Sequence, residues 1–467
     1  MSVRASDAPK VNGKVSFWFD QAVHDERSAL TGTHSADYVI VGGGFTGLWT
    51  AYHLAQSAPG ASIVILERER IGYGASGRNA GYLSALVPGN RAKIAKRYGA
   101  QAAKNLQLRM LEAVDEVAEI CSQLGIEMDA RRTGNLVVAR TPAASHRLQE
   151  RRQGDLRWGY TEDEVQVLSA SQFDDRVRVE GAVGGLYYPT AYRINPMSLV
   201  NGLARACEAA GVKIFEHSEV TRIAEGTAHT AQGQVQARVV LRCTEGYTPA
   251  IAKDRRRLIP VNSSIIMTDP LPDKVREEIG WRSAELLSDA AHVFIYSQIT
   301  EDGRILLGGR GAPYRYNSGV GSDGVLDRGT TQTLVERLRD MFPATKDVPI
   351  AHAWTGVLGV TRDWSASVGF DAEQQLAWAQ GYAGHGVTSA YVAAKSLAKL
   401  VLGHNDADTQ LAIVNHRTKQ WEPEPLRWLG VHTMYGLLGV ADAREERTNA
   451  ESTSLIARIA GRIAGLE

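Results

Sequence analysis

The residues with the clearest chemical potential form a glycine-rich turn near the start of the chain. Gly42-Gly43-Gly44-Phe45-Thr46-Gly47 has the spacing G-x-G-x-x-G, and Glu67 follows about 20 residues after the last glycine. In such a turn the backbone can approach a pyrophosphate, which the N–H groups and the positive dipole end of the next helix bind. The Glu67 carboxylate can accept hydrogen bonds from ribose hydroxyls and would repel a 2′-phosphate. The pattern predicts a dinucleotide site that disfavours NADP.

The three glycines of this pattern have separate physical tasks. Gly42 permits the tight turn, Gly44 has no Cβ to block the phosphates, and Gly47 lets the helix pack closely on the strand. The alternative is a glycine-rich turn in an α/β protein that binds no ligand. The complete strand–turn–helix–strand context favours the binding site over that alternative.

Two strands and one helix must hold this turn in place. Residues 37–41 and 62–66 are short apolar runs typical of buried parallel strands. Residues 46–58 place small apolar side chains on one helical face, and Pro59-Gly60 ends the helix. The three segments predict one βαβ unit.

A second glycine-rich loop, residues 71–82, follows Glu67 directly. A loop of glycines and small polar residues can run close to a flat cofactor and donate backbone N–H groups to it, so it favours a flavin. No second G-x-G-x-x-G follows a predicted strand, because residues 381–386 have a different glycine spacing. The sequence therefore predicts one bound dinucleotide, FAD, rather than a flavin together with a nicotinamide. The alternative reading is a surface loop without ligand.

The composition limits the class of protein. The 467 residues include 52 Lys and Arg and 52 Asp and Glu, so the formal net charge is zero. This balance gives no sign of electrostatic attraction to nucleic acid or to an anionic membrane. The three cysteines lie far apart without a C-x-x-C pair, which argues against a disulfide framework or a zinc site. No apolar run reaches the roughly 18 residues that span a bilayer, and the first residues lack a secretory signal pattern. We expect a cytoplasmic protein with a small-molecule partner and no metal; the sequence assigns no oligomeric state.

The remaining pattern predicts a second sheet interleaved with the first. Further helices are expected over 91–124, 142–156, 196–210, 325–342 and 390–402, and strands over 135–139, 212–216, 237–241, 261–268, 292–298 and 304–308. The predicted fold class is α/β, with a Rossmann-like FAD-binding domain, a mixed, mainly antiparallel substrate domain and a C-terminal helical tail. The predicted ranges are an N-terminal arm (1–35), a discontinuous FAD-binding domain (36–90, 190–260 and 350–405), a substrate domain (91–189 and 261–349) and a helical extension (406–467).

Several segments together resemble the FAD-dependent D-amino acid oxidase superfamily, which includes glycine and sarcosine oxidases. They are residues 37–67, the loop Gly74-Ala75-Ser76-Gly77-Arg78-Asn79-Ala80-Gly81, residues 233–249, residues 354–369 with 381–390, and the hairpin 302–309. The arm and the tail around Trp421-Glu422-Pro423-Glu424-Pro425 are similar to the subgroup around gamma-glutamylputrescine oxidase.

The resemblance implies a set of cofactor-binding residues. Those at the ADP and flavin positions are Gly42, Gly44, Phe45, Thr46, Gly47, Glu67, Arg68, Ser76, Arg78, Asn79, Gly81, Tyr82, Leu83, Val220, Gly246, Gly384, His385, Gly386, Val387 and Thr388. The N–H groups of 384–388 are implied to face the N1–C2=O region of the flavin, where partial positive charge stabilises the reduced anion.

The resemblance also implies oxidation of a C–N bond. A hydride passes from the carbon beside the amine to flavin N5, and water hydrolyses the resulting imine. The reaction depends on a neutral, oriented amine more than on a strong base, so no catalytic residue is assigned. The expected acceptor is O2, with H2O2 as product. The alternatives are a dehydrogenase that reduces a quinone or a protein, and a non-catalytic dinucleotide-binding regulatory protein on the same fold.

One departure from the superfamily bears on the substrate. Glycine and D-amino acid oxidases hold the substrate carboxylate with an arginine shortly after a W-x-G motif, but residues 354–359 and 381–386 contain no arginine. We therefore expect an amine or N-substituted amine whose charged group, if present, lies farther from the reacting carbon. Candidate pocket residues are Arg310, Tyr314, Tyr316, His352 and Trp364, with plain packing as the alternative for each.

Some members of the superfamily attach the flavin through a cysteine late in the chain. No cysteine follows Cys243 here, which argues against that linkage and leaves attachment through a histidine open.

Overall fold

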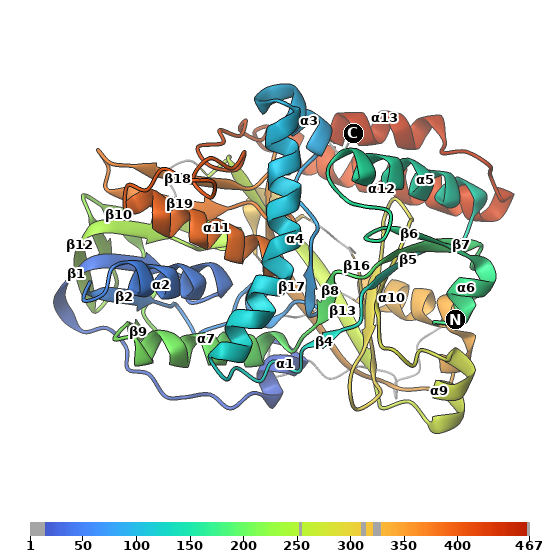
Figure 1. The fold of residues 1–467 in the computed structure, drawn as a ribbon, viewed down its shortest axis with the longest axis horizontal. Coiled ribbons are helices and arrows are strands. Elements are labelled where there is room, and N and C mark those ends of the chain that lie inside the picture. The colour runs from blue at the N-terminus through green and yellow to red at the C-terminus, as the bar shows by residue number, and fades with distance from the viewer. Residues whose placement is uncertain (1–14, 252–254, 310–313, 321–327, 465–467) are drawn as a thin grey trace.

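The computed structural model describes residues 15–251, 255–309, 314–320 and 328–464. Two large sheets lie side by side, with helix α4 (Ala100–Gln123) crossing the molecule between them (Figure 1). The α/β fold with two interleaved sheets and C-terminal helices confirms the predicted fold class.

The first sheet has a parallel centre. Its parallel strands run in the order β9 (Lys213–Phe215), β2 (Ile63–Leu66), β1 (Gly32–Val41), β12 (Gly233–Arg242) and β19 (Leu376–Gln380). Strands β10 (Arg222–Ala224), β11 (Thr227–His229) and β18 (Ser367–Asp371) join this sheet in antiparallel pairs. The predicted strands at 37–41, 62–66, 212–216 and 237–241 all lie here.

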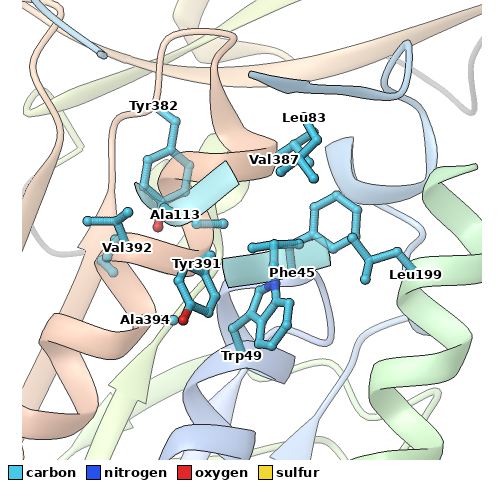
Figure 2. Close-up of a cluster of buried hydrophobic side chains, with 14 of the residues drawn as sticks. Phe45, Trp49, Leu83, Ala113, Leu199, Tyr382, Val387, Tyr391, Val392 and Ala394 are labelled. Carbon is cyan, nitrogen blue, oxygen red and sulfur yellow. The ribbon is translucent and has the colours of Figure 1, made fainter. Parts of the chain in front are cut away.

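Helices cover one face of this sheet, and the alternation of side chains in β1 shows why. Tyr38 and Ile40 join a core with α2 (Phe45–Ser57), α4, α7 (Pro196–Ala209) and α11 (Gly386–Val401), whereas Val39 and Val41 join a second core on the other face. Residues such as Phe45, Trp49, Tyr391 and Val392 meet in the larger core (Figure 2). Helices α2 and α11 thus pack directly against each other.

The second sheet is mixed and mainly antiparallel, as predicted. Its order is β17 (Ile350–Thr361), β13 (Leu258–Thr268), β16 (Ile305–Gly309), β15 (Tyr296–Ile299), β14 (Leu286–Asp289), β5 (Asn135–Ala139), β7 (Gly184–Tyr188) and β6 (Gln166–Ser169), and only the β14–β5 pair is parallel. The accompanying helices are α5 (Pro142–Arg157), α6 (Ala170–Asp174), α9 (Asp273–Ile279) and α10 (Arg328–Met341).

A third, small sheet and an N-terminal helix lie between the two large sheets. Strand β8 (Ala191–Arg193) pairs with β3 (Tyr82–Ser84) and with β4 (Arg131–Arg132). Helix α1 (Phe17–Gln21) holds the start of the described chain, because Trp18 is buried and donates from Nε1 to the carbonyl of Asn79 at 3.0 Å. Short elements are α8 (Thr248–Ile251), η2 (Ala75–Gly77), η3 (Glu245–Tyr247), η4 (Tyr316–Ser318) and η5 (Pro343–Thr345).

The C-terminal part forms α12 (Leu426–Thr448) and α13 (Leu455–Ala464) beside α5 (Figure 1). Asp442 of α12 accepts hydrogen bonds from the backbone N–H groups of His292 and Val293 at 2.8 and 2.9 Å. In the same place Arg147 of α5 pairs with Glu445 at 2.7 Å. The last helices are therefore fastened to the second sheet and to α5.

Two predicted elements differ from the structure. The helix expected over 91–124 is divided into α3 (Arg91–Tyr98) and α4, because Gly99 has a φ of +94° that a continuous helix cannot contain. The strand expected over 292–298 begins only at Tyr296, because Asp442 takes the N–H groups at its predicted start. The start of the helix predicted over 325–342 lies outside the described residues.

The domain ranges stay a prediction. Strand β17 pairs with β13 in the second sheet, although the range 350–405 assigned it to the FAD-binding part. Helix α4, assigned to the substrate part, packs on α11 of the first sheet.

Candidate active site

A pocket lies at the carboxyl ends of the parallel strands β1, β2 and β12, where α/β sheets bind ligands. Its volume is about 170 Å³. The wall includes Val41 and Leu66 at the ends of two strands, and Cys243 directly after the third. We call it the cofactor pocket.

The glycine turn forms one wall of the cofactor pocket. Gly42 has a φ of +109°, and a Cβ there would lie 2.6 Å from the carbonyl oxygen of Cys243. A Cβ on Gly47 would overlap the carbonyl oxygen of Gly42, so helix and turn can approach this closely only at glycine. Gly44 caps α2 without a side chain of its own, the Ser76 hydroxyl accepts from the N–H of Phe45 at 2.9 Å, and Gly44, Phe45 and Thr46 bring the helix N-terminus to the pocket wall.

Glu67 lies at the end of β2 with its carboxylate fixed on the pocket wall. The backbone N–H groups of Gly43 and Glu69 donate to its two oxygens at 2.7 and 3.0 Å. Burial raises the pKa of Glu67, while the two N–H donors act in the opposite direction. The oriented oxygens can accept further hydrogen bonds from hydroxyl groups in the pocket.

Alternating aromatic and basic side chains form another part of this wall. The Arg68 guanidinium lies over the rings of Tyr247 at 5.0 Å and Tyr73 at 5.5 Å, and Arg78 lies over Tyr73 at 4.7 Å. Arg78 donates to the carbonyls of Tyr73 and Thr355 at 2.7 and 2.9 Å. These contacts fix the second glycine-rich loop against β17.

Glu245 holds another part of the wall of the cofactor pocket together. Its buried carboxyl accepts hydrogen bonds from the N–H groups of Gly359 at 3.2 Å, Gly381 at 2.8 Å and Tyr382 at 3.1 Å. Burial raises the pKa of Glu245 to about 7 against these three donors. One side chain thus ties η3, β17 and the loop 381–386 together, immediately before α11 begins at Gly386.

A second, larger space adjoins the cofactor pocket. Its volume is about 540 Å³, and we call it the substrate cavity. Residues that line both spaces are Ala75, Asn79, Leu358, Gly384 and Val387. The junction therefore lies between the second glycine-rich loop, β17 and the N-terminus of α11.

The structure places most of the predicted cofactor residues in one of the two spaces. Those on the cofactor pocket are Gly42, Gly44, Phe45, Thr46, Glu67, Arg68, Ser76, Asn79, Val220, Gly246, Gly384, Gly386 and Val387. Arg78, Tyr82 and His385 line the substrate cavity. Gly47, Gly81, Leu83 and Thr388 lie behind these walls, where Thr388 accepts a hydrogen bond from the N–H of Ser84 at 3.1 Å.

The predicted substrate residues lie elsewhere. Tyr314 is buried and donates to Glu424 at 2.6 Å, and Tyr316 is exposed. Trp364 donates to the carbonyl of Ala464 at 3.0 Å, and the ring of His352 is tilted against that of Phe17, with 5.0 Å between the ring centroids. None of these four lines either space, and Arg310 lies outside the described residues.

The sequence reasoning missed the side chains that line the substrate cavity. They include Arg91, Gln107, Arg147, Arg151, Asp155, Tyr160, Tyr188, Ser263, Asp289, His292 and Tyr296. They come from α3, α4 and α5, from the strands β7, β13, β14 and β15 and from two loops, so no motif connects them. Glu245 and Tyr247 were also missed, although they lie within the segment 233–249 that carried the resemblance.

The family model of FAD dependent oxidoreductases (DAO) matches residues 37–400. The chain belongs to this family. It is 31% identical to the gamma-glutamylputrescine oxidoreductase of Escherichia coli over 82% of this chain and 86% of that protein. It is 21% identical to the glycine oxidase of Bacillus licheniformis over 79% of this chain and 93% of that protein.

Solved structures show the same fold. Glycine oxidase from Geobacillus kaustophilus superposes with a TM-score of 0.67 at 19% identity, covering 82% of this chain and all of that one. L-proline dehydrogenase from P.horikoshii gives 0.67 at 18% identity, covering 80% and 96%. The protein is an FAD-dependent oxidoreductase acting on amine or amino-acid substrates. Within the described residues, no helix combines the length and apolar character needed to cross a membrane.

Proposed function

We propose that the protein oxidises the C–N bond of an amine or N-substituted amine at the junction of the two spaces. The observation that carries this proposal is the shared wall of Ala75, Asn79, Leu358, Gly384 and Val387. A flat cofactor in the first space would present one edge or face there to a molecule in the second. Bound FAD supplies the chemistry, since N5 of its ring can accept a hydride.

The residues of the cofactor pocket fit FAD. The N-terminus of α2 suits a pyrophosphate, and the fixed Glu67 carboxylate suits ribose hydroxyls. Val220 lies on the pocket wall where the resemblance expects the adenine. The N-terminus of α11, with Gly384 and Gly386 on the wall, would bring partial positive charge to the flavin end.

The substrate cavity can favour the reactive form of an amine. A carbon beside a nitrogen gives up a hydride only when the nitrogen lone pair is free, so the amine must be neutral. Arg78 is buried and lies on the cavity wall, where its charge opposes a nearby ammonium ion. The surrounding wall excludes water and orients the amine, which together supply much of the rate enhancement.

The cavity favours substrates larger than a simple α-amino acid. Gly356 and Leu358 line it in the stretch where glycine oxidases are expected to carry their arginine, and no arginine occurs at 354–359. A relative is named for gamma-glutamylputrescine, an amine whose carboxylate lies far from the terminal nitrogen. We therefore propose an extended amine as substrate, O2 as acceptor and H2O2 as product.

Anaerobic titration of the purified flavoprotein with a panel of amines tests this proposal. Extended primary amines should bleach the flavin absorbance, whereas glycine and D-alanine should bleach it slowly. Admitting air should restore the absorbance and release peroxide in equal amount. Bleaching by glycine as the best substrate contradicts the proposed substrate, and reoxidation by a dye or quinone but not by O2 contradicts the proposed acceptor.

We also propose that the flavin is not bound through cysteine. Cys243 lines the cofactor pocket beside the glycine turn, and burial raises the pKa of its thiol to about 12, which suppresses the reactive thiolate. Unfolding in acid should separate the yellow colour from the protein. Colour that stays with the protein, and with a peptide containing Cys243, contradicts this.

A further inference from the structure

The wall of the substrate cavity away from the junction is a hydrogen-bonded network of polar side chains. Arg91, the first residue of α3, donates to Gln107 at 2.7 Å and to Asp155 at 2.5 Å. Tyr188 of β7 donates to the other oxygen of Asp155 at 2.7 Å. Gln107 in turn donates to the carbonyl of Ala85 at 2.9 Å. The network joins α3, α4, α5 and β7 into one rigid wall.

Arg151 also lines this wall, but its contact with the Asp155 carboxylate is longer than that of Arg91. It lies one turn before Asp155 on α5, and its Nε is 3.9 Å from the Asp155 carboxylate. Its guanidinium lies 5.2 Å over the ring of Tyr188. The Arg151 side chain keeps 32% of its surface exposed, against 4% for Asp155, and it lines the cavity. A planar guanidinium in this position can offer several N–H donors to a ligand.

The charges on this wall do not balance. Arg91 and Arg151 face the single carboxylate of Asp155, and the other charged groups of the described cavity wall are held elsewhere. Arg147 pairs with Glu445, and Asp289 lies 3.4 Å from Arg337. Arg78, beside the junction, donates to two backbone carbonyls and keeps its charge there. On the wall away from the junction, the positive charge of Arg151 therefore remains for a ligand to neutralise.

This charge and the junction belong to different parts of the cavity wall. The residues that line both spaces come from 75–79, 358 and 384–387, whereas Arg151 belongs to α5, which lies beside α12 and α13 (Figure 1). A ligand that contacts both must span a cavity of about 540 Å³, which favours an extended molecule.

We propose that Arg151 binds a carboxylate at the distal end of the amine substrate. Arg91 and Tyr188 fix the neighbouring Asp155 in position by their hydrogen bonds to it. This inference rests on the proposed function and narrows the substrate class to extended amines with a remote carboxylate. The ion pair holds one end of the substrate. The length of the substrate between its carboxylate and its amine then places the amine at the junction. Planar, bidentate recognition by arginine gives this contact its selectivity over a neutral amide.

The decisive comparison uses two substrates that differ only at the distal end. They are γ-glutamylputrescine and its carboxamide, in which the carboxylate is replaced by a neutral amide. The variant is Arg151→Gln, and the matched control is Arg157→Gln, an exposed arginine at the end of the same helix. Flavin content and the thermal midpoint verify that both variants fold.

Wild type should prefer the carboxylate substrate by about 10- to 100-fold in kcat/KM, the range of a charge-assisted hydrogen bond. Arg151→Gln should remove this preference mainly through KM, and leave the carboxamide within about twofold of wild type. Arg151→Lys should recover part of the preference, because it keeps the charge but loses the planar fork. Arg157→Gln should behave as wild type.

Binding of γ-glutamylbutylamine, which lacks the reactive amine, gives a readout independent of chemistry. Isothermal titration should show about tenfold weaker binding to Arg151→Gln than to wild type. Equal losses for both substrates, or unchanged binding of this ligand, overturn the proposal. If neither substrate bleaches the flavin of wild type, the proposed function itself fails; if both bleach it equally, only the carboxylate site fails.

Discussion

The cofactor pocket and the substrate cavity adjoin each other but are built in different ways. The cofactor pocket takes its shape from backbone: glycine turns, two helix N-termini and N–H groups fixed by Glu67 and Glu245. The substrate cavity takes its character from side chains such as Arg91, Arg151 and Tyr188, supplied by separate helices and strands.

Because the two regions are built differently, substitutions in them should have different effects. The backbone part of this pocket tolerates few changes at the glycine turn, because a Cβ at Gly42 or Gly47 would meet backbone atoms. A cavity of side chains can change its specificity while the scaffold stays the same. Variants of the first region should affect flavin binding and folding together, and variants of the second should affect the substrate alone.

The largest effect should come from Gly47→Ala. The added Cβ overlaps the Gly42 carbonyl, so turn and helix must separate. We expect protein without flavin and a loss of about 3 kcal/mol or more in the free energy of unfolding. Gly60→Ala is the control, because it has a φ of +88° but open space around it, and should cost about 1–2 kcal/mol without loss of flavin. Absorbance and chemical denaturation measure both; a flavin-loaded Gly47→Ala protein would contradict the assignment.

Glu67→Gln should weaken FAD binding by about 10- to 100-fold, since an amide oxygen replaces a charged acceptor and the amide N–H₂ meets a backbone donor. With saturating FAD, the KM for the amine should stay unchanged, which separates the two regions. Titration of apoprotein with FAD measures the effect. The neighbouring Glu69→Gln, whose side chain is 42% exposed, serves as control; equal losses in both variants would remove the special role of Glu67.

Asp442→Ala tests the wall of the substrate cavity through a residue that binds this wall but does not line the cavity. Loss of the acceptor frees the N–H groups of His292 and Val293, so the wall at 290–294 should loosen. We expect about 1–2 kcal/mol lower unfolding free energy and a several-fold higher KM at unchanged flavin content. The exposed Arg444→Ala on the same helix should leave both values unchanged. A loss of flavin instead would show that the two regions are not separable here.

The smallest effect on the flavin and the substrate concerns Glu245, because we expect it only in the pH dependence of stability. Its pKa is raised to about 7 from an ordinary 4.5, so the folded protein binds the proton more tightly than the unfolded chain. The contribution of Glu245 to the free energy of unfolding is fully present below pH 4.5 and decreases as the pH rises to about 7. Relative to Glu245→Gln, which cannot titrate, wild type should lose up to about 3 kcal/mol across this window, at about 1.4 kcal/mol for each unit of pKa. Parallel pH profiles of the two proteins would contradict the raised pKa.

The sequence was most informative where the signal is local. The strand–turn–helix unit and its glycines were predicted because one short segment contains both the turn and its packing constraints. Arg151 and Asp155 gave no signal, because their helix reads as an ordinary charged helix and their partners lie in α3 and β7. The loop at 292–295 reads as strand, since the alternation of its residues does not show that Asp442 occupies its N–H groups.

The pairing of the first sheet has a consequence for how the protein is made. Gly32 of β1 pairs with Gly233 of β12, and β12 then pairs with β19, which is followed by the helix that completes the cofactor pocket. The ribosome releases β1 and β2 long before β12 and β19 are synthesised. The edge of β1 that pairs with β12 therefore stays unpaired until then. The pocket closes only when nearly the whole chain has been synthesised. Capture of the flavin is therefore a late event, and a supply of FAD protects the nascent chain only after its last strands have emerged.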